Sequence, residues 1–423
     1  MTDLTAALLF EDLTPAERER AERVESVLPA LRDIAAEVDA RGEFHVPHIK
    51  TLSDAGLLGL IVPEAYGGLG GGLRDLAAAT FAMGTACPST SLAYFFQCSS
   101  ASRGLLPLEA IEAGLYPEDE VPAVRAFAEK VLTRLGTEGR WMANFASESA
   151  KSSSANISIG TTATKTDGGW LLNGVKAFGC ATGVADDYLV TARRADGETA
   201  EYLAVFLVDR EADGVSERER WDAVGMRATA THGIILKDVF VPDEDAMAVP
   251  GAFVKMLQVS RGSFVGSQVA GTAVYLGAAQ AAYDFAINHL TSTTFSDTGK
   301  PIGTAPMHQQ LIGHMRNELD TATLWLRRQV QLETSDPPLL PKNDVIRQWR
   351  LAKGTVAESG FEVAKTALKA CGTSNTGMSG PISRNLRDLS MGLVQAFPAE
   401  KGRIEAAQFI VEGREMTQFE GRK

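Results

Sequence analysis

The chain has 423 residues, 45% of them hydrophobic and 22% charged, which is ordinary globular composition and enough for two or three domains. Its net charge of −12, without any Lys/Arg-rich run, excludes a typical nucleic-acid binder and disfavours an anionic membrane surface. No run of about 18 apolar residues predicts a membrane span.

The first 139 residues are expected to form a helical domain. Thr14 followed by Pro15 is a typical helix start. Apolar residues at helical spacing predict helices over Ala16–Asp39, Ile49–Gly56, Leu73–Gly84, Ser89–Leu106 and Pro122–Leu135. Five glycines within Tyr66–Gly72 predict a loop. No βαβ unit surrounds this loop, so it is not a dinucleotide fingerprint.

Residues 140–249 are expected to form a compact antiparallel β domain. Short β-type runs predict strands over Ile157–Thr164, Trp170–Leu172, Tyr188–Ala192, Tyr202–Val208 and Gly233–Val241. Asn173-Gly174, directly after the second run, is a dipeptide typical of hairpin turns.

Residues 250–423 are expected to form a helical bundle. Apolar spacing predicts four long helices, over Val265–His289, Met307–Glu333, Asp344–Ala370 and Pro398–Met416. Helices, then a β domain, then a bundle make an α+β chain. This order narrows the choice of fold more than any single motif does.

Local motifs exclude several kinds of chemistry. The four cysteines are widely spaced without a CxxC pair, which disfavours a zinc ribbon and favours a reducing, cytoplasmic setting. No HExxH or GxSxG motif occurs among the scattered histidines and serines, so neither a metal centre nor a serine-hydrolase site is expected. Ser152–Ser154 is either a plain loop or a stretch whose hydroxyls and backbone N–H groups bind phosphate.

Dispersed segments resemble the acyl-CoA dehydrogenase superfamily over nearly the whole chain. They are Leu57–Gly70, Thr161–Ala163, Trp170–Lys176, Val224–Thr229, Asp238–Pro242, Arg261, Leu276–Ala282 and Arg387-Asp388, in the family's order and spacing. The resemblance implies the acyl-CoA dehydrogenase fold, with FAD bound between the β domain and the bundle of a homotetramer or dimer.

The resemblance also implies cofactor-binding residues. Phe145, Ser147 and Glu148 correspond to the family's flavin-facing strand. Phe178 and Cys180 correspond to an aromatic side chain and a hydroxyl near the reactive edge of the flavin. A donor at that edge tunes the electron affinity of the flavin, and a thiol is a weaker donor than a hydroxyl.

Two more cofactor contacts lie in segments that depart from the family. Ser152–Ala155 replaces an Ala-Gly-Ser-Asp run but keeps Ser154. Ser292–Ser296 replaces Arg-x-x-Phe-Gly and keeps Phe295. The arginine that meets FAD of a neighbouring subunit is missing, which implies weaker or exchangeable flavin binding.

The family's catalytic base is also missing. Its glutamate corresponds to Ala396 in many members and to Ser260 in another branch, and neither is a carboxylate. Glu400 is the closest remaining candidate. Alternatively, Glu400 is a first-turn glutamate favoured by the helix dipole after Pro398.

Three functions therefore remain open. The first is FAD-dependent α,β-dehydrogenation of an acyl thioester on CoA or a carrier protein, with an electron-transfer flavoprotein as partner. The second is a two-component monooxygenase, a hydroxylase or N-oxygenase, that takes reduced flavin from a flavin reductase and reacts with oxygen. Pro381–Asp388 resembles such enzymes, which do not need the glutamate. The third is a non-catalytic member. By analogy, Tyr94–Gln97 and Val254–Ser263 line the substrate pocket.

Overall fold

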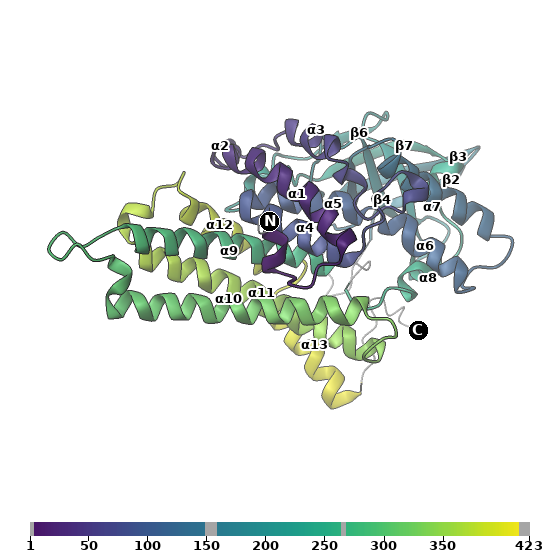
Figure 1. Ribbon diagram of the computed structural model, residues 1–423. Coiled ribbons are helices and arrows are strands. Elements are labelled where there is room, and N and C mark those ends of the chain that lie inside the picture. Colours follow the sequence, from purple (N-terminus) through teal and green to yellow (C-terminus); the bar gives the residue numbers. More distant parts are fainter. Residues whose placement is uncertain (1–3, 149–158, 264–267, 414–423) are drawn as a thin grey trace.

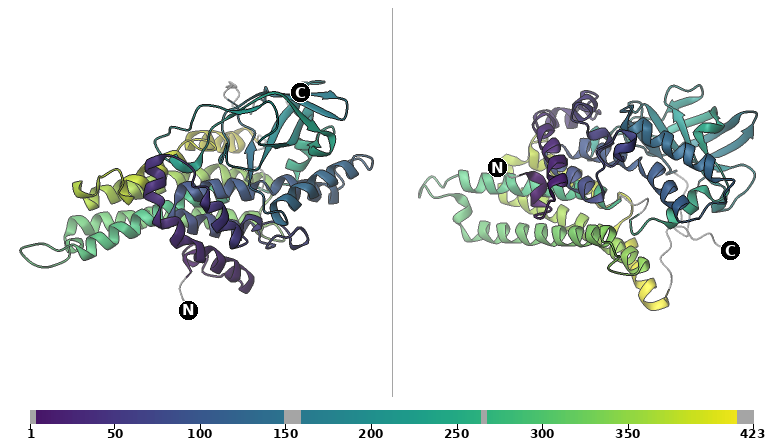
Figure 2. Two further views of the ribbon diagram at one scale, coloured as in Figure 1. Left: turned by 90° about the horizontal axis from the view of Figure 1, so that it is seen from above. Right: turned by 45° about the vertical axis from the view of Figure 1, so that its right-hand side comes forward.

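The computed structural model describes residues 4–148, 159–263 and 268–413 of the chain. An N-terminal group of helices, a β sheet and a set of long C-terminal helices follow one another, as the sequence predicts (Figure 1). Both further views show the long helices extending away from the sheet (Figure 2). None of the described helices is long and apolar enough to cross a membrane.

The N-terminal helices confirm most of the predicted elements but divide two of them. Thr14 caps the first helix in a capping box with Glu17. The stretch Ala16–Asp39 breaks at Ile34, where the backbone leaves helical geometry, and Ser89–Leu106 breaks at Ser100 and Ala101. The helices are α1 Pro15–Asp33, α2 Ala35–Arg41, α3 Pro47–Asp54, α4 Leu73–Ala86, α5 Pro88–Ser99, α6 Ser102–Glu112 and α7 Val121–Gly136.

The middle part is one eight-stranded sheet with β1 beside β4 and the other strands in the order β6-β7-β3-β2-β4-β5-β8. The strands are β1 Met142–Phe145, β2 Thr162–Thr166, β3 Gly169–Lys176, β4 Asp187–Arg194, β5 Leu203–Asp209, β6 Val215–Glu217, β7 Ile234–Pro242 and β8 Ala246–Met247. The expected antiparallel pairing joins most neighbouring strands, but both β1 and β2 run parallel to β4. The crossover after β3 brings β4 back alongside them.

The predicted hairpin at Asn173-Gly174 is wrong. The turn between β2 and β3 lies at Asp167-Gly168, and Asn173-Gly174 lies inside β3 at an irregularity in its pairing with β7. Gly174 has φ +154°, and a Cβ there would lie 2.5 Å from Thr161 Oγ1. The glycine therefore serves a close approach inside the sheet rather than a turn.

The C-terminal part contains α8 Ala252–Gln258, α9 Gln268–Ser292, α10 Pro306–Thr334, α11 Lys342–Cys371, α12 Pro381–Gly392 and α13 Ala399–Glu412. The expected bundle forms, but α12, which helical spacing did not single out, packs against α9 and α11, whereas α13 packs against α11 alone among the long helices. Helix α4 lies against α9, where a Cβ on Gly277 would meet Phe81 O at 2.1 Å. The N-terminal helices and the bundle thus share a core.

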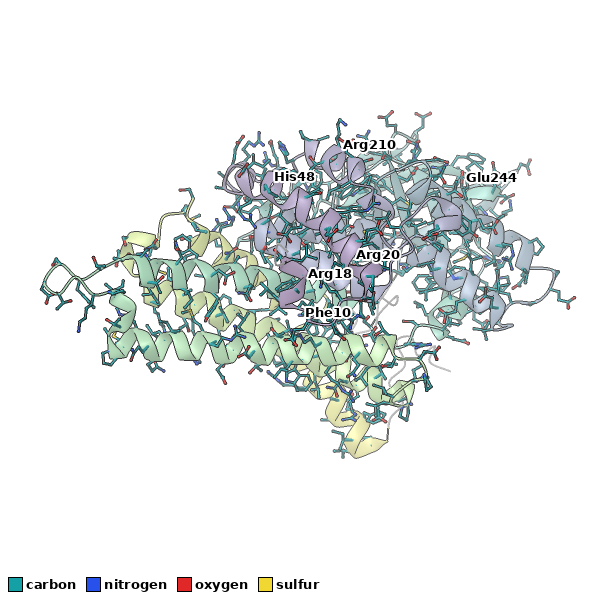
Figure 3. The ribbon with its side chains drawn as sticks, viewed as in Figure 1. Phe10, Arg18, Arg20, His48, Arg210 and Glu244 are labelled. Carbon is teal, nitrogen blue, oxygen red and sulfur yellow. The ribbon has the colours of Figure 1, made fainter. Side chains whose placement is uncertain are left out.

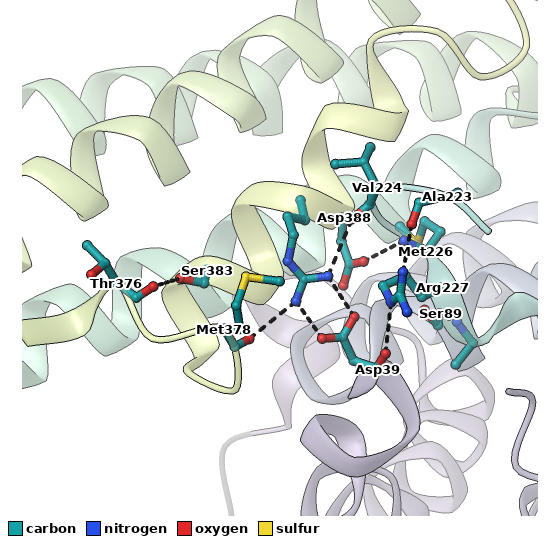
Figure 4. Close-up of polar contacts among 12 residues, drawn as sticks. Asp39, Ser89, Ala223, Val224, Met226, Arg227, Thr376, Met378, Ser383 and Asp388 are labelled. Atoms are coloured by element: carbon teal, nitrogen blue, oxygen red, sulfur yellow. Dashed lines mark hydrogen bonds and ion pairs between the residues drawn. The ribbon is translucent and has the colours of Figure 1, made fainter. Parts of the chain in front are cut away.

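One polar junction joins all three parts of the chain (Figure 4). Arg387 of α12 pairs with Asp39 of α2 and donates to Val224 O in the middle part. The neighbouring carboxylate of Asp388 accepts from Met226 N at 2.6 Å. Asp388 is fully buried, and burial raises its pKa to about 6. This junction fixes the sheet against the bundle.

The Asp388→Asn variant is expected to gain stability relative to the wild type as the pH rises. Because the folded-state pKa of Asp388 lies above its ordinary 3.8, its contribution to the free energy of unfolding is complete below pH 3.8 and is lost as the pH rises through 6. Asparagine keeps an acceptor for Met226 N–H but does not titrate. The difference in unfolding free energy, mutant minus wild type, should rise by about 3 kcal/mol between pH 4 and pH 7. Urea denaturation across that range measures it, with exposed Asp119→Asn as control, and a pH-independent difference would contradict the prediction.

Candidate functional site

The predicted residues Phe145 to Glu148 and Phe178 to Cys180 come together where β1 ends. Ala177 N donates to Ser147 O at 2.9 Å. The backbone of Gly179 lies against the Phe145 ring, so closely that a Cβ would be 2.4 Å from it. Phe145 is fully buried and stacks edge-on with Tyr188, whereas Ser147 and Phe178 are exposed. Phe145 therefore belongs to the buried core under the site, while the side chains of Ser147 and Phe178 are exposed.

Glu148 holds the end of β1 to its neighbours. Its carboxylate accepts from Lys176 Nζ at 2.7 Å, from Thr161 N and Oγ1, and from Gly160 N. The Lys176 side chain is completely buried and that of Glu148 is 8% exposed. Burial alone would raise the pKa of Glu148, but the hydrogen bonds and charge of Lys176 and Thr161 outweigh it and lower the pKa. The ion pair thus fixes the segment after β1 that carries Ser147.

Cys180 belongs to a chain of small polar side chains. Its Sγ lies 3.1 Å from Thr231 Oγ1, which lies 2.6 Å from Thr229 Oγ1. Burial raises the pKa of the Cys180 thiol to about 12, so it remains protonated at neutral pH. Sequence reasoning missed Thr231, although it lies two residues beyond the matching segment Val224–Thr229.

Tyr275 and Gln395 form a second polar pair that sequence reasoning missed. The Tyr275 hydroxyl donates to Gln395 Oε1. Burial raises the pKa of Tyr275 well above its ordinary value, and the nearby Cys180 and Asp388 raise it further, so the phenol is neutral. An aromatic residue in an apolar helix is normally part of the core, and only the fold brings this one close enough to Cys180 and Asp388 for them to act on its pKa.

Neither expected base position is itself a carboxylate, although the buried Glu333 accepts a hydrogen bond from the Ser263 hydroxyl at 2.8 Å, three residues beyond Ser260. Ala396 lies in the turn between α12 and α13 with φ +62°, and Ser260 donates its hydroxyl to Ser263 O. Lys353 of α11 holds the same turn, donating to Gly392 O at 2.8 Å and Phe397 O at 2.5 Å. The turn is therefore fixed by a buried ammonium while its own side chains stay neutral.

In the described part of the chain, neither Glu400 nor Phe295 shares the hydrogen bonds that join Cys180 to Thr231 and Tyr275 to Gln395. Glu400 is exposed in the first turn of α13. It borders a groove of about 350 Å³ whose lining includes Glu358, Phe361 and Leu393 and none of the predicted flavin residues. Phe295 lies in the connection between α9 and α10, which Figure 1 shows at the end of the bundle remote from the sheet. Ser154 lies outside the described residues.

The histidines are not gathered into a metal site in the described part of the chain, where no group of three potential ligands occurs. His48, labelled in Figure 3 on the N-terminal helices, is buried, with Nδ1 3.0 Å from Thr90 Oγ1. Burial lowers its pKa to about 4, so the imidazole is neutral at neutral pH. It is a packing residue.

The cluster can hold a planar, polar-edged ring. Phe178, an aromatic side chain that is 51% exposed, packs edge-on against Trp221 with ring centroids 6.0 Å apart and offers a flat apolar surface. The Cys180 thiol and the Thr231 hydroxyl offer hydrogen bonds to the edge of such a ring. The residues present therefore fit a flavin, and Ser147 and Phe178 are the exposed members of the predicted set.

Three family models match the chain. They are "Acyl-CoA dehydrogenase, N-terminal domain" over residues 14–107, "Acyl-CoA dehydrogenase, middle domain" over 143–239 and "Acyl-CoA dehydrogenase, C-terminal domain" over 269–397. Among similar proteins, L-evernosamine nitrososynthase of Micromonospora sp. is 30% identical over 92% of this chain and 88% of its own length. Cyclohex-1-ene-1-carbonyl-CoA dehydrogenase of Syntrophus aciditrophicus is 26% identical over 90% and 86%.

Two solved structures illustrate the shared fold. KijD3, in complex with FMN and a dTDP-linked amino-keto sugar, has a TM-score of 0.80 at 25% identity and covers 98% of each chain. Butyryl-CoA dehydrogenase of Megasphaera elsdenii has a TM-score of 0.79 at 19% identity and covers 95% of this chain and 99% of its own, which supports the fold alone.

Proposed function

The chain belongs to the acyl-CoA dehydrogenase superfamily of flavin-dependent oxidoreductases, and from that premise we propose that it is a two-component monooxygenase. In this role it uses reduced flavin and oxygen to oxidise a small molecule. The observation that carries the proposal is the neutral character of the cluster around Cys180, Tyr275 and Gln395.

Dehydrogenation of a thioester needs a base that removes a proton, and such a base is typically worth about 10²–10⁴-fold in rate. Within the described residues no carboxylate hydrogen-bonds to Cys180, Tyr275 or Gln395. Asp388 is a carboxylate that acts on the pKa of Tyr275, but it is held by Met226 N in the junction between the chain's parts. The cluster lacks the group that dehydrogenation requires, and oxygen chemistry does not require it.

The residues of the cluster would serve a monooxygenase in distinct ways. A reduced flavin, when bound, supplies the electrons that activate oxygen. Tyr275 and Gln395 present a hydroxyl and an amide that orient a polar group of the substrate. Cys180 and Thr231 contact the polar edge of the flavin, and buried Phe145 and Gly179 keep water from that side. Each role uses a neutral side chain.

The flavin is proposed to exchange with the solution, because Ser292 stands where the family has a phosphate-binding arginine. KijD3 contains FMN, so both FMN and FAD are candidates here. A flavin reductase is the partner that the proposal needs. In a homotetramer or dimer, Phe295 would contact the flavin of a second copy, since its own chain places it at the far end of the bundle.

Anaerobic and aerobic assays separate the two chemistries. Purified protein loaded with FAD or FMN is mixed with a panel of acyl-CoA thioesters without oxygen, and flavin absorbance is recorded. Separately, reduced flavin bound to the protein is mixed with oxygen in a stopped-flow instrument. We expect no bleaching by any thioester and a protein-dependent change in the rate of flavin reoxidation. Bleaching by a thioester would overturn the proposal in favour of dehydrogenation.

Glu400→Gln is expected to leave flavin affinity and reoxidation rate within about twofold of wild type, because Glu400 is exposed and borders a separate groove.

Tyr275→Phe removes one hydrogen bond to Gln395, which is worth about 1 kcal/mol, and should change substrate turnover about fivefold. Titration with flavin and steady-state oxygen consumption measure both variants. If wild type is bleached by a thioester and Glu400→Gln is not, Glu400 is the missing base.

A further inference from the structure

Arg103 is a buried cation without a partner. It lies in the first turn of α6 and is 4% exposed. Its Nε and Nη1 atoms are buried and make no hydrogen bond, and no carboxylate of the described part of the chain acts on it. Its guanidinium carbon lies 5.4 Å from the centre of the Phe253 ring. Burial lowers its pKa to about 10, so it is charged at neutral pH.

This lack of a partner distinguishes Arg103 from the other buried cations. Of the three buried Lys and Arg side chains that the structure describes, Lys176 pairs with Glu148 and Lys353 donates to two carbonyl oxygens. Burying a charge without such partners costs several kcal/mol. The contact with Phe253 offsets only part of that, because a cation over an aromatic ring is worth about 0.5–2 kcal/mol. An anionic ligand would supply the missing compensation.

The location of Arg103 connects it to the flavin strand. One turn before it, Ser100 Oγ accepts from Asn144 Nδ2 at 2.7 Å, and Asn144 precedes Phe145 in β1. In the preceding helix α5, the Phe95 ring lies against Gly271 of α9, one turn before Tyr275. Arg103 follows Phe95 by eight residues, and the helix is interrupted between them at Ser100 and Ala101. Arg103 therefore directly follows the helix that packs against both β1 and α9.

We propose that Arg103 binds an anionic group of the substrate, a carboxylate or a phosphate, at the end remote from the reacting atom. This rests on the proposed function, since it takes the cluster around Tyr275 as the place of reaction. The planar guanidinium presents a fork of donors that matches both groups in two parallel hydrogen bonds. Substrates without negative charge at that end would leave the cation unpaired and be rejected.

The test measures anion binding without reductase, oxygen or turnover, so its outcome is independent of the monooxygenase assignment. Flavin-loaded protein is heated in the presence of inorganic pyrophosphate, succinate or chloride at equal ionic strength, and the unfolding temperature is followed. We expect pyrophosphate or succinate to raise Tm in a saturable manner, and the more effective anion identifies the phosphate or carboxylate class. Equal Tm values in all three salts would overturn the proposal.

Two variants and a control make the test specific to this residue. Arg103→Met should abolish the Tm response and, without anion, unfold at a higher temperature than wild type because a buried unpaired charge is removed. Arg103→Lys keeps the charge but loses the fork, and it should weaken anion binding at least tenfold. The exposed Arg328→Met should respond like wild type. A Tm response that persists in Arg103→Met or Arg103→Lys at wild-type affinity would place the anion elsewhere and refute the assignment.

Discussion

Glu148→Gln is expected to lower the free energy of unfolding by about 3–5 kcal/mol, because it leaves a fully buried ammonium without its counter-charge. Lys176 is completely buried and its Nζ lies 2.7 Å from the Glu148 carboxylate. Glutamine also replaces one of the two carboxylate oxygens, which accept from Thr161 and Gly160, with an amide NH₂ that cannot accept. The segment after β1 that carries Ser147 would then be free to move, so flavin affinity should fall at least tenfold. Urea denaturation and flavin titration measure the two effects.

A double variant decides whether the charge or the packing is responsible. In Glu148→Gln with Lys176→Met, no buried ammonium is left uncompensated, so most of the lost stability should return. The low pKa of Glu148 adds a pH signature, because a carboxyl whose folded pKa is depressed stabilises above its ordinary pKa of 4.5 and loses that contribution as the pH falls through the folded value. If the stability losses of the two single substitutions simply add in the double variant, the ion pair does not carry the effect.

Arg387→Met is expected to cost about 3 kcal/mol and to loosen the bundle from the other two parts of the chain. The side chains of Arg387 and Asp39 are 14% and 8% exposed, so the substitution leaves a nearly buried carboxylate unpaired. It also removes the donor to Val224 O, and with it a contact to the middle part (Figure 4). Urea denaturation gives the energy, and limited proteolysis between the sheet and α9 reports the loosening.

The double variant Arg387→Met with Asp39→Asn is the matched control for that experiment. When both charges of the pair are absent, no carboxylate is stranded, and the double variant should be more stable than Arg387→Met alone. The exposed pair of Arg316 and Asp320 offers a comparison, since removing Arg316 should cost less than about 1 kcal/mol. Equal costs for Arg387→Met and Arg316→Met would contradict the role given to the junction.

The order of the three parts was predictable because each carries its own periodicity and turn residues. Helical spacing located α4, α9, α10 and α11, and the motif segments Leu57–Gly70 and Val224–Thr229 matched one family. The details that failed depend on distant neighbours. Asn173-Gly174 is a hairpin signal locally, but Thr161 approaches Gly174 so closely that the dipeptide lies within a strand. The parallel pairing of β1 with β4 depends on a crossover that no local pattern records.

The candidate site was likewise predictable from the sequence only in part. The sequence by itself determined that Ala396 and Ser260 are not carboxylates, and that Phe145, Ser147, Glu148, Phe178 and Cys180 belong to flavin-facing segments by resemblance. Only the tertiary structure decided what surrounds them. It placed Tyr275 against Gln395, gave Lys176 to Glu148 and left Arg103 buried without a partner. The sequence gives the identity of each side chain. Its charge state and its unsatisfied hydrogen bonds depend on burial and on partners that folding brings from distant positions in the sequence.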